Sequence, residues 1–183
     1  MKEILIVVDC QNDFIEGSLH NEDAIKVIPN IVKKIRNFKG DAIYVTLDTH
    51  EENYLDTKEG KRLPVVHCIK DTFGWKLESN VKSALTDASL RNIKVVYIEK
   101  PTFGSNKLVS EIQFNDEFKN EELNIEMIGF CTDICVVSNA ILLKSTFYDR
   151  GNISVIEDCC AGVTPETHFA ACKTMQMCQI DIK

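Results

Sequence analysis

Two cysteines lie four residues apart where a predicted strand meets a predicted helix. Residues 124–128 form an apolar run typical of a strand, and residues 134–148 form a longer apolar-rich segment typical of a helix. Cys131 and Cys135 fall at the junction of the two. Free backbone N–H groups and the positive end of the helix dipole favour a thiolate at a helix start. Either cysteine could therefore be a nucleophile, and we take Cys135 as the candidate.

Other polar residues follow the remaining apolar runs of the chain. Asp9 ends the first run, and Asp48 and His50 come directly after the second. Lys100 follows the third run. Because catalytic and binding sites of parallel sheets form at the carboxyl ends of the strands, we expect these side chains to converge on Cys135.

Segments typical of strands alternate with segments typical of helices along the whole chain. The strands are predicted over residues 4–8, 41–47, 93–98, 124–128, 153–156 and 179–182. The helices are predicted over residues 29–38, 80–90, 107–118, 133–150 and 165–177, with Pro29 in the first turn of its helix. This alternation predicts an α/β fold with three α/β/α layers and a mainly parallel central sheet. Residues 1–183 are expected to form a single domain.

Composition excludes several classes of partner. The 183 residues carry a formal net charge of -7, which argues against nucleic acid or an anionic membrane as the main partner. No apolar run approaches the roughly 18 residues of a membrane span, and the N-terminal run has no features of an export signal. We therefore expect a cytoplasmic protein whose eight cysteines are mostly buried and reduced.

The chain resembles the cysteine hydrolases of the isochorismatase-like superfamily, and within it the nicotinamidases and pyrazinamidases. The resemblance rests on VVDCQNDF at 7–14, DTH at 48–50, Lys100, and GFCTDIC at 129–135. It covers nearly the whole chain, and it implies the isochorismatase-like, Rossmann-like fold. Any one of these motifs is a weak match, whereas all four in this order are a specific one.

The resemblance implies a catalytic triad of Asp9, Lys100 and Cys135. Lys100 and the helix start are expected to lower the pKa of the Cys135 thiol, while Asp9 accepts its proton and later protonates the leaving ammonia. Backbone N–H groups of Cys131 and Cys135 are expected to hold the oxyanion. The Phe130–Cys131 peptide bond is implied to be cis, and the Cys131 thiol is expected to be dispensable.

The resemblance also implies a divalent metal ion near the substrate. Asp48, His50 and His67 match its ligands, and Glu59 is the candidate fourth ligand, with Asp56 as a competitor. Carboxylate and imidazole ligands suit Zn²⁺, Mn²⁺ or Fe²⁺. In the family this ion binds the pyridine nitrogen of nicotinamide and orients its ring. No organic cofactor is expected.

The polar segment 51–76 is long for a loop inside a compact domain, which favours a functional role. Three aromatic residues in loops near the predicted site, Phe14, Trp75 and Phe103, are candidates to stack on a flat substrate ring, although ordinary packing explains each equally well. His168, in the last predicted helix, has no place in the family pattern.

These residues predict hydrolysis of a small carboxamide through a thioester on Cys135. Nicotinamide, giving nicotinate and ammonia as in NAD salvage, is the leading substrate. The first alternative is a cysteine amidase of the same superfamily that acts on an N-carbamoyl or ureido compound. The second is a non-catalytic redox or binding protein that uses Cys131 and Cys135 as a pair. The family further implies a homo-oligomer.

Overall fold

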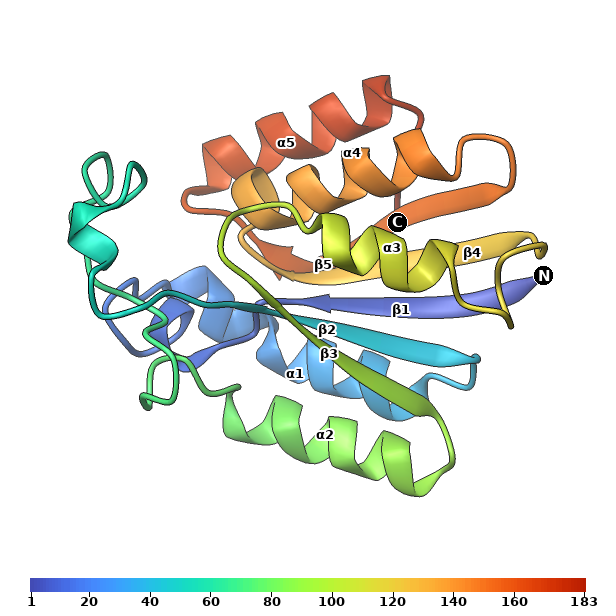
Figure 1. The fold of residues 1–183 in the computed structure, drawn as a ribbon, viewed down its shortest axis with the longest axis horizontal. Helices are drawn as coiled ribbons and strands as arrows, with labels where there is room; N and C mark the ends of the chain where they lie inside the picture. Colours follow the sequence, from blue (N-terminus) through green and yellow to red (C-terminus); the bar gives the residue numbers. More distant parts are fainter.

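The computed structural model describes all 183 residues as one sheet flanked by helices (Figure 1). The strands are β1 (Lys2–Val8), β2 (Ala42–Asp48), β3 (Lys94–Lys100), β4 (Leu123–Phe130), β5 (Gly151–Ala161) and β6 (Asp181–Ile182). The helices are α1 (Glu22–Asn37), α2 (Ser79–Leu90), α3 (Asn106–Gln113), α4 (Val137–Thr146) and α5 (Pro165–Met177). All neighbouring strands are parallel, in the order β3-β2-β1-β4-β5-β6. The predicted α/β class and parallel sheet are confirmed.

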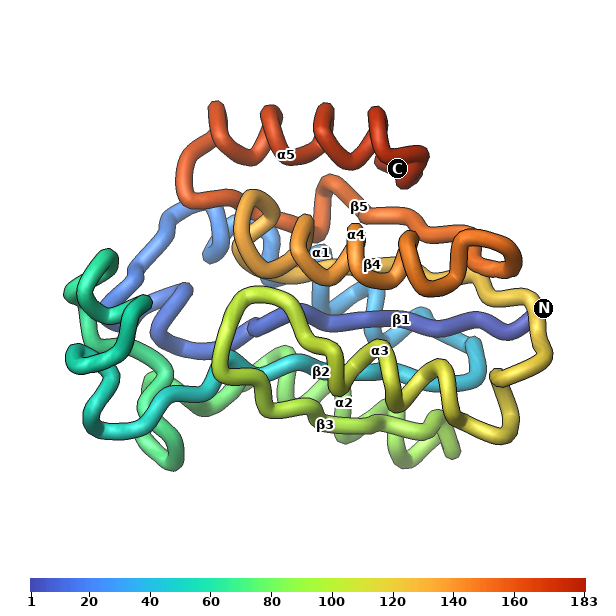
Figure 2. Tube along the Cα trace, turned by 45° about the horizontal axis from the view of Figure 1, so that its top comes forward, coloured from blue at the N-terminus to red at the C-terminus, as the bar shows by residue number.

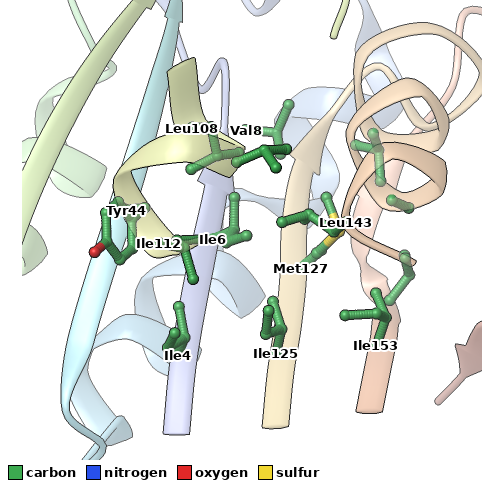
Figure 3. Packing of buried hydrophobic residues seen from close by; sticks show 14 of the residues in the cluster. Ile4, Ile6, Val8, Tyr44, Leu108, Ile112, Ile125, Met127, Leu143 and Ile153 are labelled. Carbon is green, nitrogen blue, oxygen red and sulfur yellow. The ribbon is translucent and has the colours of Figure 1, made fainter. Parts of the chain in front are cut away.

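Helices cover both faces of the sheet, as the tube in Figure 2 makes clear. Alternate residues of a strand point to opposite faces, so Ile4 and Ile6 of β1 face α3 and α4 while Leu5 and Val7 face α1 and α2. Figure 3 shows the first of these two cores, in which Ile6 lies beside Ile112 of α3. Burial on both faces explains why β1 is a continuous apolar run.

The chain builds β1, β2 and β3 outward and then crosses back to place β4 on the other side of β1. In open parallel sheets, ligands bind outside the carboxyl ends of the strands at such a reversal. The segments 9–21 and 49–78 cover this end of the sheet, at the left of Figure 1. Asp9 and Cys135 follow the two central strands and therefore lie on either side of the reversal.

Helix α1 begins earlier than predicted, because residue 21 caps it. Asn21 Oδ1 accepts hydrogen bonds from the backbone N–H groups of Asp23 and Ala24, at 2.9 and 3.1 Å, which satisfies donors that a helix start leaves free. The helix therefore starts at Glu22, and Pro29 lies in its interior rather than in its first turn. The prediction for Pro29 was wrong because a strong cap outweighed the unfavourable proline.

Two further helices differ from their predicted spans. The segment predicted as one helix over 133–150 is a five-residue π-helix, Thr132–Val136, followed by α4. Helix α3 ends at Gln113 instead of continuing to residue 118. Wider π turns are rare and have no simple apolar period, so sequence periodicity does not distinguish them from α-helix.

All eight cysteines are free thiols, and six of them are buried. None of the helices combines the length and apolar character that a membrane crossing requires.

Gly129 of β4 is the position where the fold most strictly requires glycine. Its φ is +119°, and a Cβ atom there would lie 2.0 Å from the backbone oxygen of Val8 in β1. We expect Gly129→Ala to lower the free energy of unfolding by at least about 2 kcal/mol, because both strain and overlap with backbone arise. Urea unfolding measures this loss. Gly104→Ala is the control, because the one atom that its Cβ would approach too closely is the flexible end of Leu142. An equal loss there would contradict the explanation.

Candidate active site

Asp9 follows β1 and is completely buried, with a backbone φ of +47°. Its Oδ1 accepts a hydrogen bond from Thr46 Oγ1 of β2 at 2.6 Å. Its Oδ2 lies 2.7 Å from the Lys100 ammonium and pairs with that charge. A carboxylate oxygen has two lone pairs, so Oδ2 can also take up a proton.

Lys100 is the last residue of β3, two strands away from β1, and only 1% of it is exposed. Its side chain spans β2 and places Nζ 2.7 Å from Asp9 Oδ2. The same Nζ lies 3.4 Å from Cys135 Sγ and 3.4 Å from Asp48 Oδ1. One buried cation therefore serves three acidic groups, and the structure brings the three predicted triad residues together.

Cys135 lies buried within the π-helix that follows β4. The Phe130–Cys131 peptide bond before this helix is cis, which confirms the expectation from the resemblance. The backbone N–H of Cys131 donates no hydrogen bond within the chain, so it is free for a ligand, as expected of an oxyanion donor.

Sequence reasoning missed Asn139, a buried amide one turn beyond Cys135. Its Nδ2 donates to the backbone oxygens of Cys135 at 2.8 Å and Phe103 at 3.1 Å, and its Oδ1 accepts from the backbone N–H of Ser105 at 2.9 Å. Asn139 thus ties the loop after β3 to the helix that carries the thiol. A polar residue four positions after the cysteine, in an otherwise apolar segment, was the available signal.

The pKa of the Cys135 thiol differs from the expectation. Burial raises the pKa of the Cys135 thiol, the Asp9 carboxylate raises it further, and Lys100 lowers it only in part. The prediction that this pKa is lowered was wrong, because the thiol is buried beside a carboxylate. Burial also raises the pKa of Asp9, against the opposing effect of Lys100. A carboxylate with a raised pKa beside a protonated thiol is suited to take up the thiol proton.

Asp48, His50 and His67 form a second buried group beside Lys100, and their ligand atoms all lie within 4.8 Å of one another. Asp48 Oδ2 lies 3.1 Å from His50 Nε2 and 3.4 Å from His67 Nε2. Glu59 Oε1 lies 3.7 Å from His50 Nε2, whereas Asp56 is exposed. The structure thus brings three predicted metal ligands together, places Glu59 beside His50, and leaves the competitor Asp56 on the exposed surface.

The donor set fits a metal ion. His67 Nδ1 lies 2.7 Å from the backbone oxygen of Val65, which can only accept, so this nitrogen carries the proton. In neutral His67 the lone pair of Nε2 then faces the carboxylate of Asp48, and a cation between them removes the repulsion. Burial raises the pKa of Asp48, but the imidazoles, when they are protonated, donate hydrogen bonds to it and lower that pKa overall. A carboxylate with two imidazoles suits Zn²⁺, Mn²⁺ or Fe²⁺.

A cavity of about 550 Å³ opens onto these groups. Its lining includes Cys131, Cys135, Asp48, Glu59, His67, Phe14 and Phe103. It also includes His20, which sequence reasoning did not assign to the site. Trp75 does not line this cavity, because its indole N–H donates to Thr49 Oγ1 at 2.9 Å and its ring borders a separate pocket. Two of the three aromatic candidates thus lie where a flat ring could contact them.

Comparison with known proteins agrees with this architecture. The model of the isochorismatase domain matches residues 3–182. A probable inactive nicotinamidase of Arabidopsis thaliana is 25% identical over 174 residues, which cover 91% of this chain and 84% of that protein. The structure of the nicotinamidase/pyrazinamidase PncA from Bacillus subtilis matches with a TM-score of 0.83 and 24% identity, covering 100% of this chain and 99% of that one. The pyrazinamidase of Pyrococcus horikoshii, in complex with zinc, matches with a TM-score of 0.76 and 24% identity, covering 100% and 99%.

The fold and the site together define a class of α/β protein. Its members carry an aspartate, a lysine and a cysteine at the carboxyl ends of parallel strands. The chain belongs to the isochorismatase family.

Replacing Lys100 tests whether the buried ion pair holds the site together. We expect Lys100→Met to lower the free energy of unfolding by about 3 kcal/mol at neutral pH, because it leaves the Asp9 carboxylate buried without its cation. Without the Lys100 charge, the pKa of Asp9 rises further above its already raised value in the unaltered protein. The stability difference between the two proteins should therefore grow as the pH rises above the Asp9 pKa of the unaltered protein, because only the variant then keeps that proton. Urea unfolding at several pH values measures both effects.

Lys70→Met is the matched control, because Lys70 pairs with Glu99 at 2.6 Å on the exposed surface. Such pairs contribute little to stability, so this variant should unfold much like the unaltered protein at every pH. Equal losses in the two variants would show that the burial of Lys100 is not what matters.

Metal content tests the Asp48 group directly. We expect His67→Ala to lower the divalent metal bound per chain, because it removes one of three buried ligands. Elemental analysis after dialysis against Zn²⁺ or Mn²⁺ gives this number. His20→Ala is the control, since His20 lines the same cavity but lies outside the ligand group. Unchanged metal content in His67→Ala would remove His67 from the ligand set.

Proposed function

We propose that this chain is a cysteine-dependent amidohydrolase that cleaves a small carboxamide to an acid and ammonia, with nicotinamide as the leading substrate. The observation that carries the proposal is the position of Lys100 Nζ, 2.7 Å from Asp9 Oδ2 and 3.4 Å from Cys135 Sγ, beside a cavity. Membership of the isochorismatase family and the likeness to nicotinamidase structures support it.

In the first step the thiol of Cys135 transfers its proton to Asp9, and Sγ attacks the carbonyl carbon of the amide. Lys100 stabilises the sulfur while it carries negative charge. The carbonyl oxygen becomes an oxyanion, and the free N–H of Cys131 together with the N–H of Cys135 is placed to stabilise it. Such donors contribute on the order of 3 kcal/mol each in other enzymes.

In the second step the carbon–nitrogen bond breaks and Asp9 delivers its proton to the leaving ammonia. The acyl group remains on Cys135 as a thioester. A water molecule, whose proton passes to Asp9, then attacks the thioester. The acid leaves, the proton returns to sulfur, and the chain regains its starting state. The raised pKa of Asp9 suits this alternation between base and acid.

A divalent ion would be held beside the substrate by Asp48, His50 and His67, with Glu59. When bound, the ion would supply a Lewis-acid contact for a ring nitrogen of the substrate. Phe14 would flank the ring as one wall of the cavity. These groups favour a flat nitrogen heterocycle that bears a carboxamide.

The match to a probable inactive nicotinamidase supports a second candidate, a binding protein without catalysis. The complete Asp9, Lys100 and Cys135 group favours the enzyme, because a binding protein has no need of a buried thiol beside a proton acceptor. Ammonia release separates the two candidates.

Two cysteine variants test the proposed chemistry. We expect Cys135→Ala to lower kcat for ammonia release from nicotinamide by at least about 10³-fold, since the nucleophile is lost. Cys131→Ala should retain substantial activity, because only the backbone of residue 131 is used. A coupled assay for ammonia measures both. Intact hydrolysis in Cys135→Ala would disprove the triad, and equal loss in both variants would favour a cysteine pair.

The same assay over a panel of amides tests the substrate. Nicotinamide and pyrazinamide present a ring nitrogen and a carboxamide, whereas N-carbamoyl amino acids and ureido acids present neither ring nor ring nitrogen. A higher kcat/KM on the first pair supports the proposed substrate class. Preference for the second pair would move the activity to another amidase of the superfamily, and release from none would favour the binding protein.

A further inference from the structure

A second group of metal-binding side chains lies on α5 and β5, away from the cavity. His168 and Cys172 lie one helical turn apart on α5, and Glu157 of β5 faces them. His168 Nε2 lies 3.7 Å from Glu157 Oε1 and 3.8 Å from Cys172 Sγ, and the three ligand atoms all lie within 4.8 Å of one another. None of these residues has a part in the proposed hydrolysis.

We propose that Glu157, His168 and Cys172 form a second metal site that takes Zn²⁺ or a similar borderline divalent cation. Zinc binds sulfur at about 2.3 Å and nitrogen or oxygen at about 2.0–2.2 Å in tetrahedral geometry. These bond lengths place neighbouring ligand atoms about 3.4–3.6 Å apart. The separations of 3.7 and 3.8 Å from His168 to its two neighbours therefore need only shifts of a few tenths of an ångström, and Glu157 and Cys172 lie within 4.8 Å of each other.

The charges of the three ligands and the exposure of the site also suit a divalent cation. When the cation binds, the Cys172 thiol loses its proton to solvent and a sulfur–metal bond forms, without any change of oxidation state. The thiolate and the Glu157 carboxylate then balance the two positive charges, while neutral His168 adds none. The side chain of Cys172 is buried, but that of Glu157 is half exposed, so the ion reaches the site from the Glu157 side. Water completes the fourth position.

The other ring nitrogen of His168 is already engaged, as is usual for metal-binding histidines. Nδ1 lies 2.8 Å from the hydroxyl of Thr132, a fully buried residue at the start of the π-helix that carries Cys135. The hydroxyl can accept a hydrogen bond from Nδ1–H, and in this tautomer the lone pair of Nε2 is left for the cation. A bound metal would thereby hold His168, and through Thr132 the segment of the proposed nucleophile.

The two candidate metal sites differ in their ligand atoms. Asp48, His50 and His67 offer oxygen and nitrogen only, whereas the α5 site includes sulfur. In Figure 1, α5 lies beside α4, on the sheet face opposite α1 and α2. The α5 proposal does not rest on the proposed hydrolysis and would stand if that failed.

Cobalt distinguishes the two sites, because Co²⁺ bound to a thiolate absorbs by charge transfer from sulfur. Full-length protein is stripped with a chelator under reducing conditions and titrated with Co²⁺ alone. We expect the sulfur-to-cobalt band to appear and to saturate within two equivalents, because the two candidate sites share the added cobalt. Cys172→Ser should lose the band and one equivalent of bound cobalt, whereas His67→Ala should keep the band. Excess Zn²⁺ should abolish the band by displacing cobalt.

Cys178→Ser is the matched control, because Cys178 is an exposed cysteine near the end of the chain and belongs to neither group. It should keep the band in full. Glu157→Gln alters a half-exposed side chain and should raise the Co²⁺ concentration needed for half saturation, which covers the case that Cys172→Ser does not fold. Absence of the band from the unaltered protein would overturn the proposal. It would also be overturned if the band persisted in Cys172→Ser while Glu157→Gln bound Co²⁺ as tightly as the unaltered protein.

Discussion

The buried ion pair between Asp9 and Lys100 is the interaction on which the rest of the site depends. Two charged groups out of contact with water are tolerated only when each has a partner, and here Nζ lies 2.7 Å from Oδ2. Asp9 follows β1, while Lys100 ends β3, so the pair crosses over β2. This crossing draws the ends of three strands together and leaves room for a thiol at 3.4 Å from the same cation.

Burial also decides how the thiol can react. A cysteine at an exposed helix start gains from a nearby cation and loses its proton easily, but Cys135 is buried beside a carboxylate, and its pKa is raised. The proton therefore has to leave for a specific acceptor when the substrate arrives. Asp9, with its own raised pKa, is that acceptor in the proposed reaction.

Asp48 links the candidate metal ligands to the candidate triad. Its Oδ1 lies 3.4 Å from Lys100 Nζ, and its Oδ2 faces two imidazoles. One carboxylate thus lies between the cation beside the thiol and the site that would orient the substrate. The α5 group contacts the π-helix through Thr132. The segment carrying Cys135 is therefore linked to one candidate metal group through Lys100 and to the other through Thr132.

Much of this protein follows from local sequence alone. Continuous apolar runs predict buried parallel strands, because burial on both faces requires apolar side chains at every position, and polar residues directly after those runs predict a site at the strand ends. Family motifs then separated Cys135 from Cys131. Local sequence did not predict the early start of α1 at its Asn21 cap, the π-helix around Cys135 or the place of Trp75 outside the cavity. It also did not predict the raised pKa of the thiol or the grouping of His168 with Glu157 and Cys172. Only the tertiary structure decided these features, because each depends on which distant side chains share a buried space, and no local pattern records that.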